Sequence, residues 1–201
     1  MQRSKWTRRQ FSARLLLASV AGTLVLGCPT GEIDNEEAAR RAYLGLDRAI
    51  DRAIKLGFDG YNAASNANIP EQSEPGAVAG MMIVGGQVDA GVSNNKEMRL
   101  LVTLEDDYSD GPVEDIDLVY NGGPLNLDLS MQGLPNAQLT GTFIGAVAMT
   151  GDLTGEVSLD LAITGETEED PDGNIRRKPG TVRVQGTATS DYGVFDVDIS
   201  L

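Results

Sequence analysis

The sequence contains no histidine, and Cys28 is its only cysteine. Zinc, copper, haem and iron–sulfur sites depend on these two residue types, so the usual ligands for such sites are missing. Catalysis by a nucleophile paired with histidine is excluded for the same reason. Aromatic residues make up only 5% of the chain, which is few for a sugar-binding cleft, and no two carboxylates stand out as a glycosidase pair. We therefore expect a protein without a cofactor and without enzymatic activity.

Basic residues are also scarce, with 16 Lys and Arg against 30 Asp and Glu. Five of the basic residues lie in the first 14 positions, and that stretch has no acidic residue. Without residues 1–27, 16 less 5 leaves 11 basic residues against 30 acidic ones, a formal charge of −19. Such a surface repels nucleic acid and anionic lipid headgroups, so we expect no nucleic-acid partner.

The basic start of the chain is followed by an apolar segment over residues 15–27. This layout is typical of an export signal peptide, and the segment is shorter than the about 20 apolar residues of a membrane-spanning helix. It runs into Val25-Leu26-Gly27-Cys28, which resembles the lipobox of bacterial lipoprotein precursors. The resemblance implies cleavage between Gly27 and Cys28 and a covalent lipid on Cys28. The alternative is an ordinary signal peptide with an incidental cysteine.

A second motif within the leader, Thr7-Arg8-Arg9-Gln10-Phe11, resembles the twin-arginine export signal. It implies that Arg8 and Arg9 direct export of an already folded domain, although a chance pair in a basic leader is the alternative. The residue after Cys28 is Pro29. In lipoproteins of two-membrane bacteria an aspartate there favours the inner membrane, so the resemblance implies a lipid anchor in the outer membrane. The sequence leaves open which face of that membrane the domain occupies.

A short tether over residues 28–35 is followed by the spacing of an amphipathic helix over residues 36–60. Glu36 and Glu37 suit the positive end of the helix dipole, and Gly57 or Gly60 is expected to end the helix. Packing of this helix on the sheet of the same chain is favoured over contact of its basic face with a membrane. The apolar stripe consists of Ala39, Ala42, Leu46, Ala49, Ala53 and Leu56.

Residues 61–76 are expected to form a polar linker, and residues 77–201 an antiparallel meander in one domain with the helix. The apolar period there is two, as in strands with one buried face. Apolar pairing predicts the hairpin registers, because a slip of one residue would expose every apolar side chain. One hairpin is expected to turn at residues 121–124. The expected strands are 77–92, 97–105, 114–121, 125–132, 137–149, 154–164, 180–189 and 194–201. The expected pairs include Val88 with Val102, Val147 with Val157 and Ala188 with Phe195.

The expected fold class is therefore α+β and mostly β. The helix packs on a strongly curled, up-and-down antiparallel sheet of about eight strands, in a half-barrel or barrel-like form. Gly141, Gly145 and Gly186 lie opposite large aliphatic residues in the expected pairing, which would permit strong coiling. A lipid-facing outer-membrane barrel is disfavoured, because such barrels carry aromatic girdles and have no use for a lipobox.

Two acidic segments are weak candidates for a calcium site, since calcium takes six to eight oxygen ligands. The first contains Asp106, Asp107 and Asp110, and the second contains Asp170 and Asp172. Neither spacing matches a calcium-binding loop, so solvated acidic loops are the favoured interpretation and no metal is expected.

The sequence therefore predicts a lipid-anchored, non-enzymatic interaction or structural module of the cell envelope, with another envelope protein as its partner. The alternative is a carrier of an apolar, lipid-like ligand in a cavity between the helix and the sheet.

Overall fold

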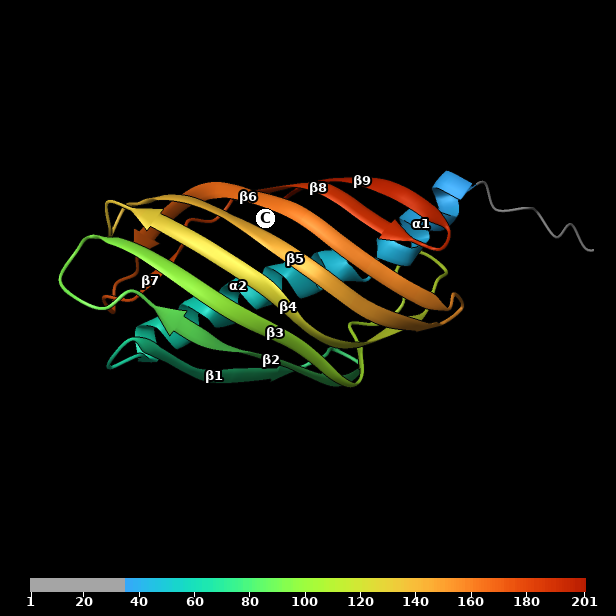
Figure 1. The fold of residues 1–201 in the computed structure, drawn as a ribbon, viewed down its shortest axis with the longest axis horizontal. Helices are drawn as coiled ribbons and strands as arrows, with labels where there is room; N and C mark the ends of the chain where they lie inside the picture. Colours follow the sequence, from blue (N-terminus) through green and yellow to red (C-terminus); the bar gives the residue numbers. More distant parts are fainter. Residues whose placement is uncertain (1–34) are drawn as a thin grey trace, which may run out of the picture. The chain divides into compact units, whose positions relative to one another are not determined.

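The structure is a computed structural model that describes residues 35–201. It contains two helices, α1 (Asn35–Tyr43) and α2 (Leu46–Ala63), and one antiparallel sheet of nine strands. The fold is thus α+β and mostly β, as the sequence predicts (Figure 1). The strands are β1 (Asn68–Pro75), β2 (Ala79–Val88), β3 (Asn95–Ser109), β4 (Leu118–Gln132), β5 (Gln138–Gly151), β6 (Gly155–Glu169), β7 (Ile175–Arg177), β8 (Arg183–Ser190) and β9 (Gly193–Ser200).

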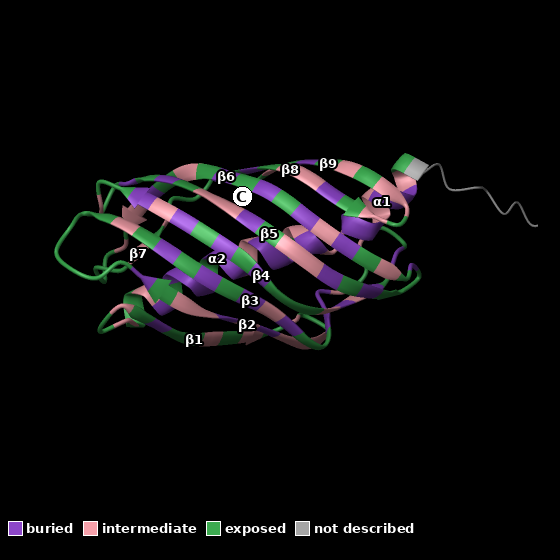
Figure 2. Ribbon diagram, viewed as in Figure 1, coloured by how far each residue is buried: buried purple, intermediate pink, exposed green. Residues whose placement is uncertain are grey.

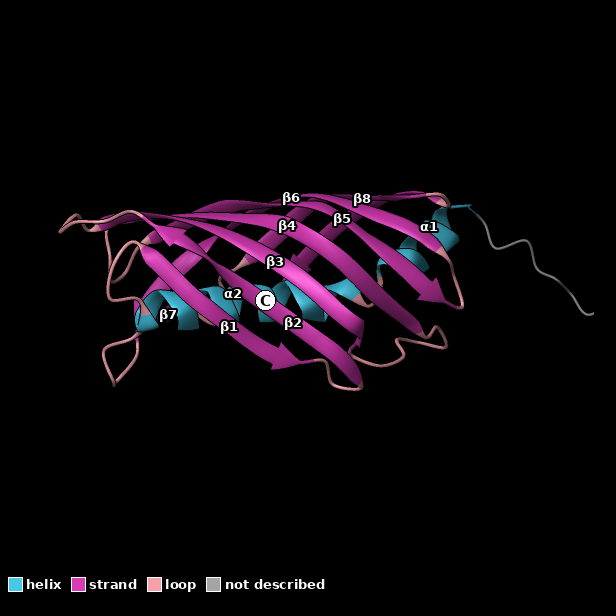
Figure 3. Cartoon of the chain, turned by 60° about the horizontal axis from the view of Figure 1, so that its bottom comes forward, coloured by secondary structure: helices cyan, strands magenta, loops and turns pink. Residues whose placement is uncertain are grey.

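Neighbours in the sheet are neighbours in the sequence, with the order β1-β2-β3-β4-β5-β6-β8-β9 and β7 paired with the end of β6. The predicted meander is confirmed, but the predicted strong curl and barrel-like closure are wrong. β1 and β9 are the two edges of an open sheet and do not pair with each other. Because α2 lies across one face of the sheet (Figure 3), a helix about 10 Å in diameter keeps those edges apart.

The alternation predicted along the strands is confirmed (Figure 2). In β4, Leu125, Leu127 and Leu129 are buried, whereas Asn126 and Asp128 are exposed. The helices cover the buried face, and α2 contributes Ile50 and Ile54 to the same core. The apolar stripe of the helix therefore packs on the sheet of its own chain.

The helix predicted over residues 36–60 is two helices, broken at Leu44 and Gly45. The ring of Tyr120 occupies the break: its hydroxyl donates to the carbonyl of Ala42 at 3.0 Å, and a Cβ on Gly45 would lie 2.8 Å from its Cε2. A side chain at position 45 would collide with that ring. A tyrosine from the middle of the sheet, distant in sequence, thus sets the break.

Gly57 and Gly60 do not end the helix, since α2 continues to Ala63. Both glycines face neighbouring side chains, because a Cβ on Gly57 would lie 2.5 Å from Leu100 Cδ1 and one on Gly60 would lie 2.6 Å from Ile69 Cγ2. The two residues therefore permit close packing of α2 on the sheet.

Residues 61–76, predicted as a linker, contain the last turn of α2 and the edge strand β1. β1 pairs with β2 despite Pro70 and Pro75, with a register shift between Ile69 and Gln72. Proline is tolerated on an edge strand because one side of that strand needs no donors. Pairing with β2 therefore makes residues 68–75 a strand, although their sequence is polar and contains proline.

The hairpin predicted at residues 121–124 is wrong, because β4 is a single strand that runs through it. Its two halves both pair with β3 and β5, and the register shifts between Asn121 and Asn126. Gly122 and Gly123 adopt positive φ at this irregularity, which glycine accepts without steric cost. Pairing with the long strands β3 and β5 on its two sides favours one continuous strand β4 over a hairpin turn at residues 121–124.

Two of the predicted registers are confirmed, since Val147 lies opposite Val157 and Ala188 lies opposite Phe195. The β2–β3 register is wrong by four residues, because Val88 lies opposite Met98 and not opposite Val102. An even shift keeps each side chain on its predicted face. Burial alone therefore did not distinguish the two registers.

Glu37 in the first turn of α1 is bound by two arginines, with Arg40 Nε at 2.8 Å and Arg41 Nε at 2.7 Å. These hydrogen bonds, Arg40 first, lower the pKa of Glu37 to about 2. Arg40 also contacts Glu114 at 2.7 Å, which joins α1 to the β3–β4 connection.

We expect the carboxyl of Glu37 to titrate at about pH 2, so that its ion pairs persist down to that pH and are lost as the pH falls through it. The pKa is lower in the folded state than in the unfolded one, so this contribution favours folding above the ordinary carboxyl range. Carboxyl-carbon NMR titration measures the pKa directly. In Arg40→Gln the pKa of Glu37 should rise, whereas Arg176→Gln, which is distant from α1, should leave that pKa unchanged. An ordinary carboxyl pKa for Glu37 in the unaltered protein would contradict the ion pairs.

Candidate functional site

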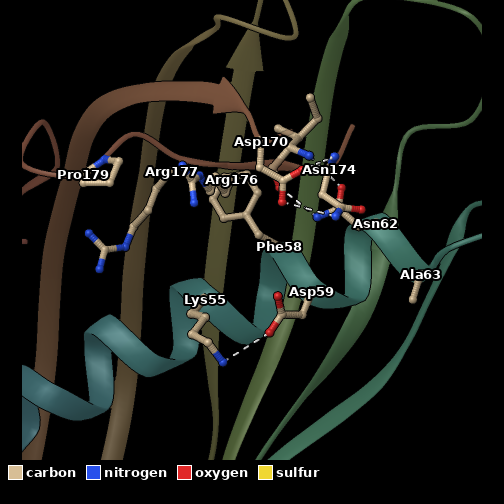
Figure 4. A pocket seen from close by; sticks show the side chains of 11 residues that line it. Lys55, Phe58, Asp59, Asn62, Ala63, Asp170, Asn174, Arg176, Arg177 and Pro179 are labelled. Atoms are coloured by element: carbon tan, nitrogen blue, oxygen red, sulfur yellow. Dashed lines mark hydrogen bonds and ion pairs between the residues drawn. The ribbon is translucent and has the colours of Figure 1, made fainter. Parts of the chain in front are cut away.

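A hollow lies where the end of α2 meets the β6–β7 hairpin, and we call it the helix-end groove (Figure 4). It has a volume of about 620 Å³. Asn62 fixes its wall, because its side-chain amide donates to the Ile175 carbonyl at 2.8 Å and its Oδ1 accepts the Ile175 N–H at 2.9 Å. The residues that line it are Lys55, Phe58, Asp59, Asn62, Ala63, Asp170, Asn174, Ile175, Arg176, Arg177 and Pro179.

Four of the five charged side chains that line the helix-end groove, all but Asp170, pair with groups of opposite charge. Lys55 Nζ lies 3.4 Å from Asp59, Arg176 lies 2.7 Å from Glu168, and Arg177 pairs with Asp51 on α2. Phe58, Ile175 and Pro179 add apolar surface. No serine, threonine, cysteine or histidine lines this groove in the described chain.

The acidic segment with Asp170 and Asp172 was predicted to be a solvated loop between the strands 154–164 and 180–189, and in the structure it forms a small hairpin. β7 pairs with the end of β6, so that Glu168 lies opposite Arg176. Asp170 closes the turn, because its Oδ1 accepts the N–H groups of Asp172 and Asn174, each at 2.9 Å. The Asn174 N–H in particular lowers the pKa of Asp170.

In the second calcium candidate, the carboxylate of Asp170 is used by hydrogen bonds within its own turn. One oxygen of Asp170 bonds to two backbone N–H groups and the other accepts the Asn174 side chain at 3.2 Å. Asp172 is exposed and contributes only its backbone N–H.

The first calcium candidate is divided between the surface and the core. Asp106 and Asp107 have positive φ at a register irregularity of β3, and Asp107 accepts the Asn121 amide at 2.7 Å. Asp110 instead points inward, with its side chain only 1% exposed. Across residues 35–201 no three acidic, histidine or cysteine side chains are grouped as metal ligands.

Asp110 is the centre of a buried cluster that we call the Asp110 cluster. Arg52 Nη2 donates to Oδ1 at 2.8 Å, the Ala77 N–H donates to Oδ1 at 2.9 Å, and the Tyr108 hydroxyl donates to Oδ2 at 2.7 Å. Arg52 also donates to Pro75 and contacts Glu74. Burial raises the pKa of Tyr108. The cluster joins α2 to β1, β3 and the β1–β2 connection, so its carboxylate has a structural role.

A second pair of buried polar atoms, Tyr43 Oη and Asp47 Oδ1, has no hydrogen-bond partner among the described atoms. Burial raises the pKa of both Tyr43 and Asp47. Tyr43 packs on Phe195 of β9, with ring centroids 5.4 Å apart. Tyr43 therefore lies in the core beneath one end of β9, whereas Asp47 as a whole residue is only partly buried.

The space between α2 and the sheet is filled by side chains. The void lined by Leu46, Ile50, Met82 and neighbouring core residues has a volume of only about 10 Å³. A void of that size is at the lower limit for a single water molecule. The described interior therefore offers no room for a lipid-like ligand in this conformation.

Sequence reasoning missed both the helix-end groove and the burial of Asp110. The groove depends on contacts between Asn62 and Ile175, which are far apart in the sequence. Leu100, Val102 and Leu104 are buried at even positions, but the alternation breaks at Asp106, which is exposed. Periodicity therefore gave no signal for the burial of Asp110. The strand was predicted to stop at residue 105.

The predicted processing and export residues, Arg8, Arg9, Gly27 and Cys28, lie outside the described residues. Within residues 35–201 neither helix is long and apolar enough to cross a membrane. Comparisons with models of protein families, with curated proteins and with solved structures found no match.

Proposed function

We propose that this protein is an exported bacterial lipoprotein, anchored in the outer membrane, whose domain acts as a non-enzymatic interaction or structural module of the cell envelope. The observation that carries the proposal is the only cysteine of the chain, placed directly after a basic and then apolar leader. A lipid on Cys28 supplies membrane affinity of about 0.8 kcal/mol per buried methylene, and more than one acyl chain makes the attachment stable.

The position of the first described residue supports a domain held close to the membrane. Asn35 begins α1 at the end of the domain opposite to the helix-end groove (Figure 1). Cys28 precedes it by seven positions, and an extended segment of that length reaches about 25 Å. The start of α1 and the groove thus lie at opposite ends of the domain, so an anchor attached through residue 35 need not cover the groove.

The charge of the chain supports a protein partner over a lipid surface. After residue 27 the formal charge is −19, from 11 basic and 30 acidic residues, so anionic headgroups repel the domain. The alternative of an apolar-ligand carrier draws no support from the interior, where the void beneath α2 is about 10 Å³.

We expect Cys28→Ala to leave the membrane fraction and to lose its lipid, because no other thiol in the chain can accept one. Fractionation of cells, followed by intact-mass measurement of the purified protein, checks both results. Gly27→Ala is the matched control, since a small residue at the cleavage position should preserve processing and attachment. Membrane retention of Cys28→Ala after a high-salt wash would overturn the anchor.

A further inference from the structure

β9 forms one border of the sheet, and no strand within residues 35–201 pairs with its outer side (Figure 1). Its register with β8 shows which backbone groups are free. Leu201 continues that register: its N–H donates to the Val182 carbonyl at 2.8 Å, and its carbonyl accepts the Gly180 N–H at 3.2 Å. Odd positions therefore bond toward β8, and alternation in an antiparallel ladder directs even positions outward. The N–H and C=O groups of Val194, Asp196, Asp198 and Ser200 line the free side.

The other border of the sheet is built differently. β1 contains Pro70 and Pro75, which have no N–H to offer, and its register is irregular. Glu74 of β1 is also bound by Arg52 and Lys55 of α2, at 3.3 and 3.2 Å. Prolines and irregular register are features that prevent an edge from pairing with another chain. β9 has no proline, and its pairing with β8 is regular over all eight residues.

The side chains of β9 specify what an added strand would contact. On the outer face, Val194 is 55% exposed and Asp196 is exposed with no ion pair among the described residues. Asp196 lies in a row with Thr187 and Asp160, so the acidic character extends into the sheet. On the inner face, Phe195 and Ile199 are only partly buried against the core. Phe195 already packs on Tyr43 of α1, so the inner-face side chains of an added strand would contact the parts of Phe195 and Ile199 that α1 leaves exposed.

We infer that the free side of β9 is a docking site for an extended segment of a partner protein, whose side chains alternate between basic residues on the outer face and apolar residues on the inner face. The backbone groups of the partner would continue the ladder, the recognition mode known as β-augmentation. Basic side chains would lie across from Asp196, and opposite charges facing each other across strands are favourable. The inference specifies the partner of the interaction module proposed above.

The same charges disfavour a second copy of this chain. Antiparallel self-pairing that keeps the faces matched and overlaps at least seven of the eight residues of β9 places Asp196 opposite either Asp196 or Asp198 of the copy. Like charges directly opposite each other destabilise strand pairing. The site is therefore assigned to a basic partner strand.

The test measures binding of short synthetic peptides to the purified full-length protein by fluorescence anisotropy at physiological ionic strength. A peptide alternating lysine and valine should bind about tenfold more tightly than one of equal charge alternating lysine and proline, because only the first can continue the ladder. The proline peptide controls for general attraction to an acidic protein. Hydrogen exchange should show new protection at Val194, Asp196, Asp198 and Ser200.

Asp196→Pro removes one outward N–H and no bond to β8, so it should abolish the preference for the valine peptide while the melting temperature changes little. Asp196→Lys should transfer the preference to a peptide that alternates glutamate and valine.

Equal binding of the two lysine peptides, protection elsewhere in the sheet, or dimerisation through β9 in sedimentation would each overturn the inference. If Asp196→Pro does not fold, hydrogen exchange in the unaltered protein with the valine peptide tests the inference in its place. Loss of the anchor in Cys28→Ala would not alter these results, so the two proposals fail separately.

Discussion

Replacement of Asp110 with alanine is expected to lower the free energy of unfolding by about 3–5 kcal/mol, the range found when one partner of a buried ion pair is removed. The Asp110 side chain is 1% exposed and Arg52 is 18% exposed, so solvent compensates little. The change leaves the guanidinium and the Tyr108 hydroxyl without their acceptor. Denaturant unfolding followed by circular dichroism gives the value.

The matched control is Asp115→Ala, an exposed carboxylate in the same acidic segment, for which we expect a change within about 0.5 kcal/mol. Asp110→Asn should lie between the two, because its amide oxygen still accepts the Ala77 N–H. A double-mutant cycle with Arg52→Ala should give an interaction energy of about 0.5–3 kcal/mol. Equal effects of Asp110→Ala and Asp115→Ala would show that the carboxylate is not buried as described.

Truncation of Ile50 to alanine is expected to lower the free energy of unfolding by about 2–5 kcal/mol. Ile50 is 1% exposed, and it lines the void of about 10 Å³ beneath α2. Removal of its outer carbons loses apolar burial and enlarges the void, because the surrounding side chains of a packed core relax only partly. Thermal and denaturant unfolding measure the loss.

Val194→Ala provides the control for Ile50→Ala, since Val194 is 55% exposed and its truncation should change stability by no more than about 0.5 kcal/mol. Benzene should raise the melting temperature of Ile50→Ala more than that of the unaltered protein, because a dry apolar cavity binds such molecules. A fatty acid that stabilised the unaltered protein strongly would instead favour the carrier alternative.

The local pattern of the chain was sufficient to predict part of the fold. Alternation of apolar and polar residues located the meander, and it placed Leu127 inside and Asp128 outside, as found. Two hairpin registers followed from apolar pairs such as Val147 with Val157. These features depend on residues near one another in the sequence, and a register slip would have exposed every apolar side chain.

The predictions failed where a distant residue determines the local structure. The break between α1 and α2 depends on Tyr120, and the passage of β4 through residues 121–124 depends on β3 and β5. Both candidate sites on the described domain have the same origin. The helix-end groove requires Asn62 to meet Ile175, and the free border at β9 exists because the sheet does not close.

The sequence by itself determined which metal ligands and nucleophiles the chain lacks, and it contains the leader from which export and lipid anchoring are proposed. The absence of histidine, the single Cys28 and the acidic surplus are properties of composition, which folding does not alter. Only the tertiary structure decided that Asp110 is a buried structural carboxylate, that the interior is filled, and that β9 is a free edge. The reason is physical. The burial of a side chain, the closure of the sheet and the presence of unpaired backbone groups depend on which segments distant in sequence contact each other, and periodicity along the chain does not specify those contacts.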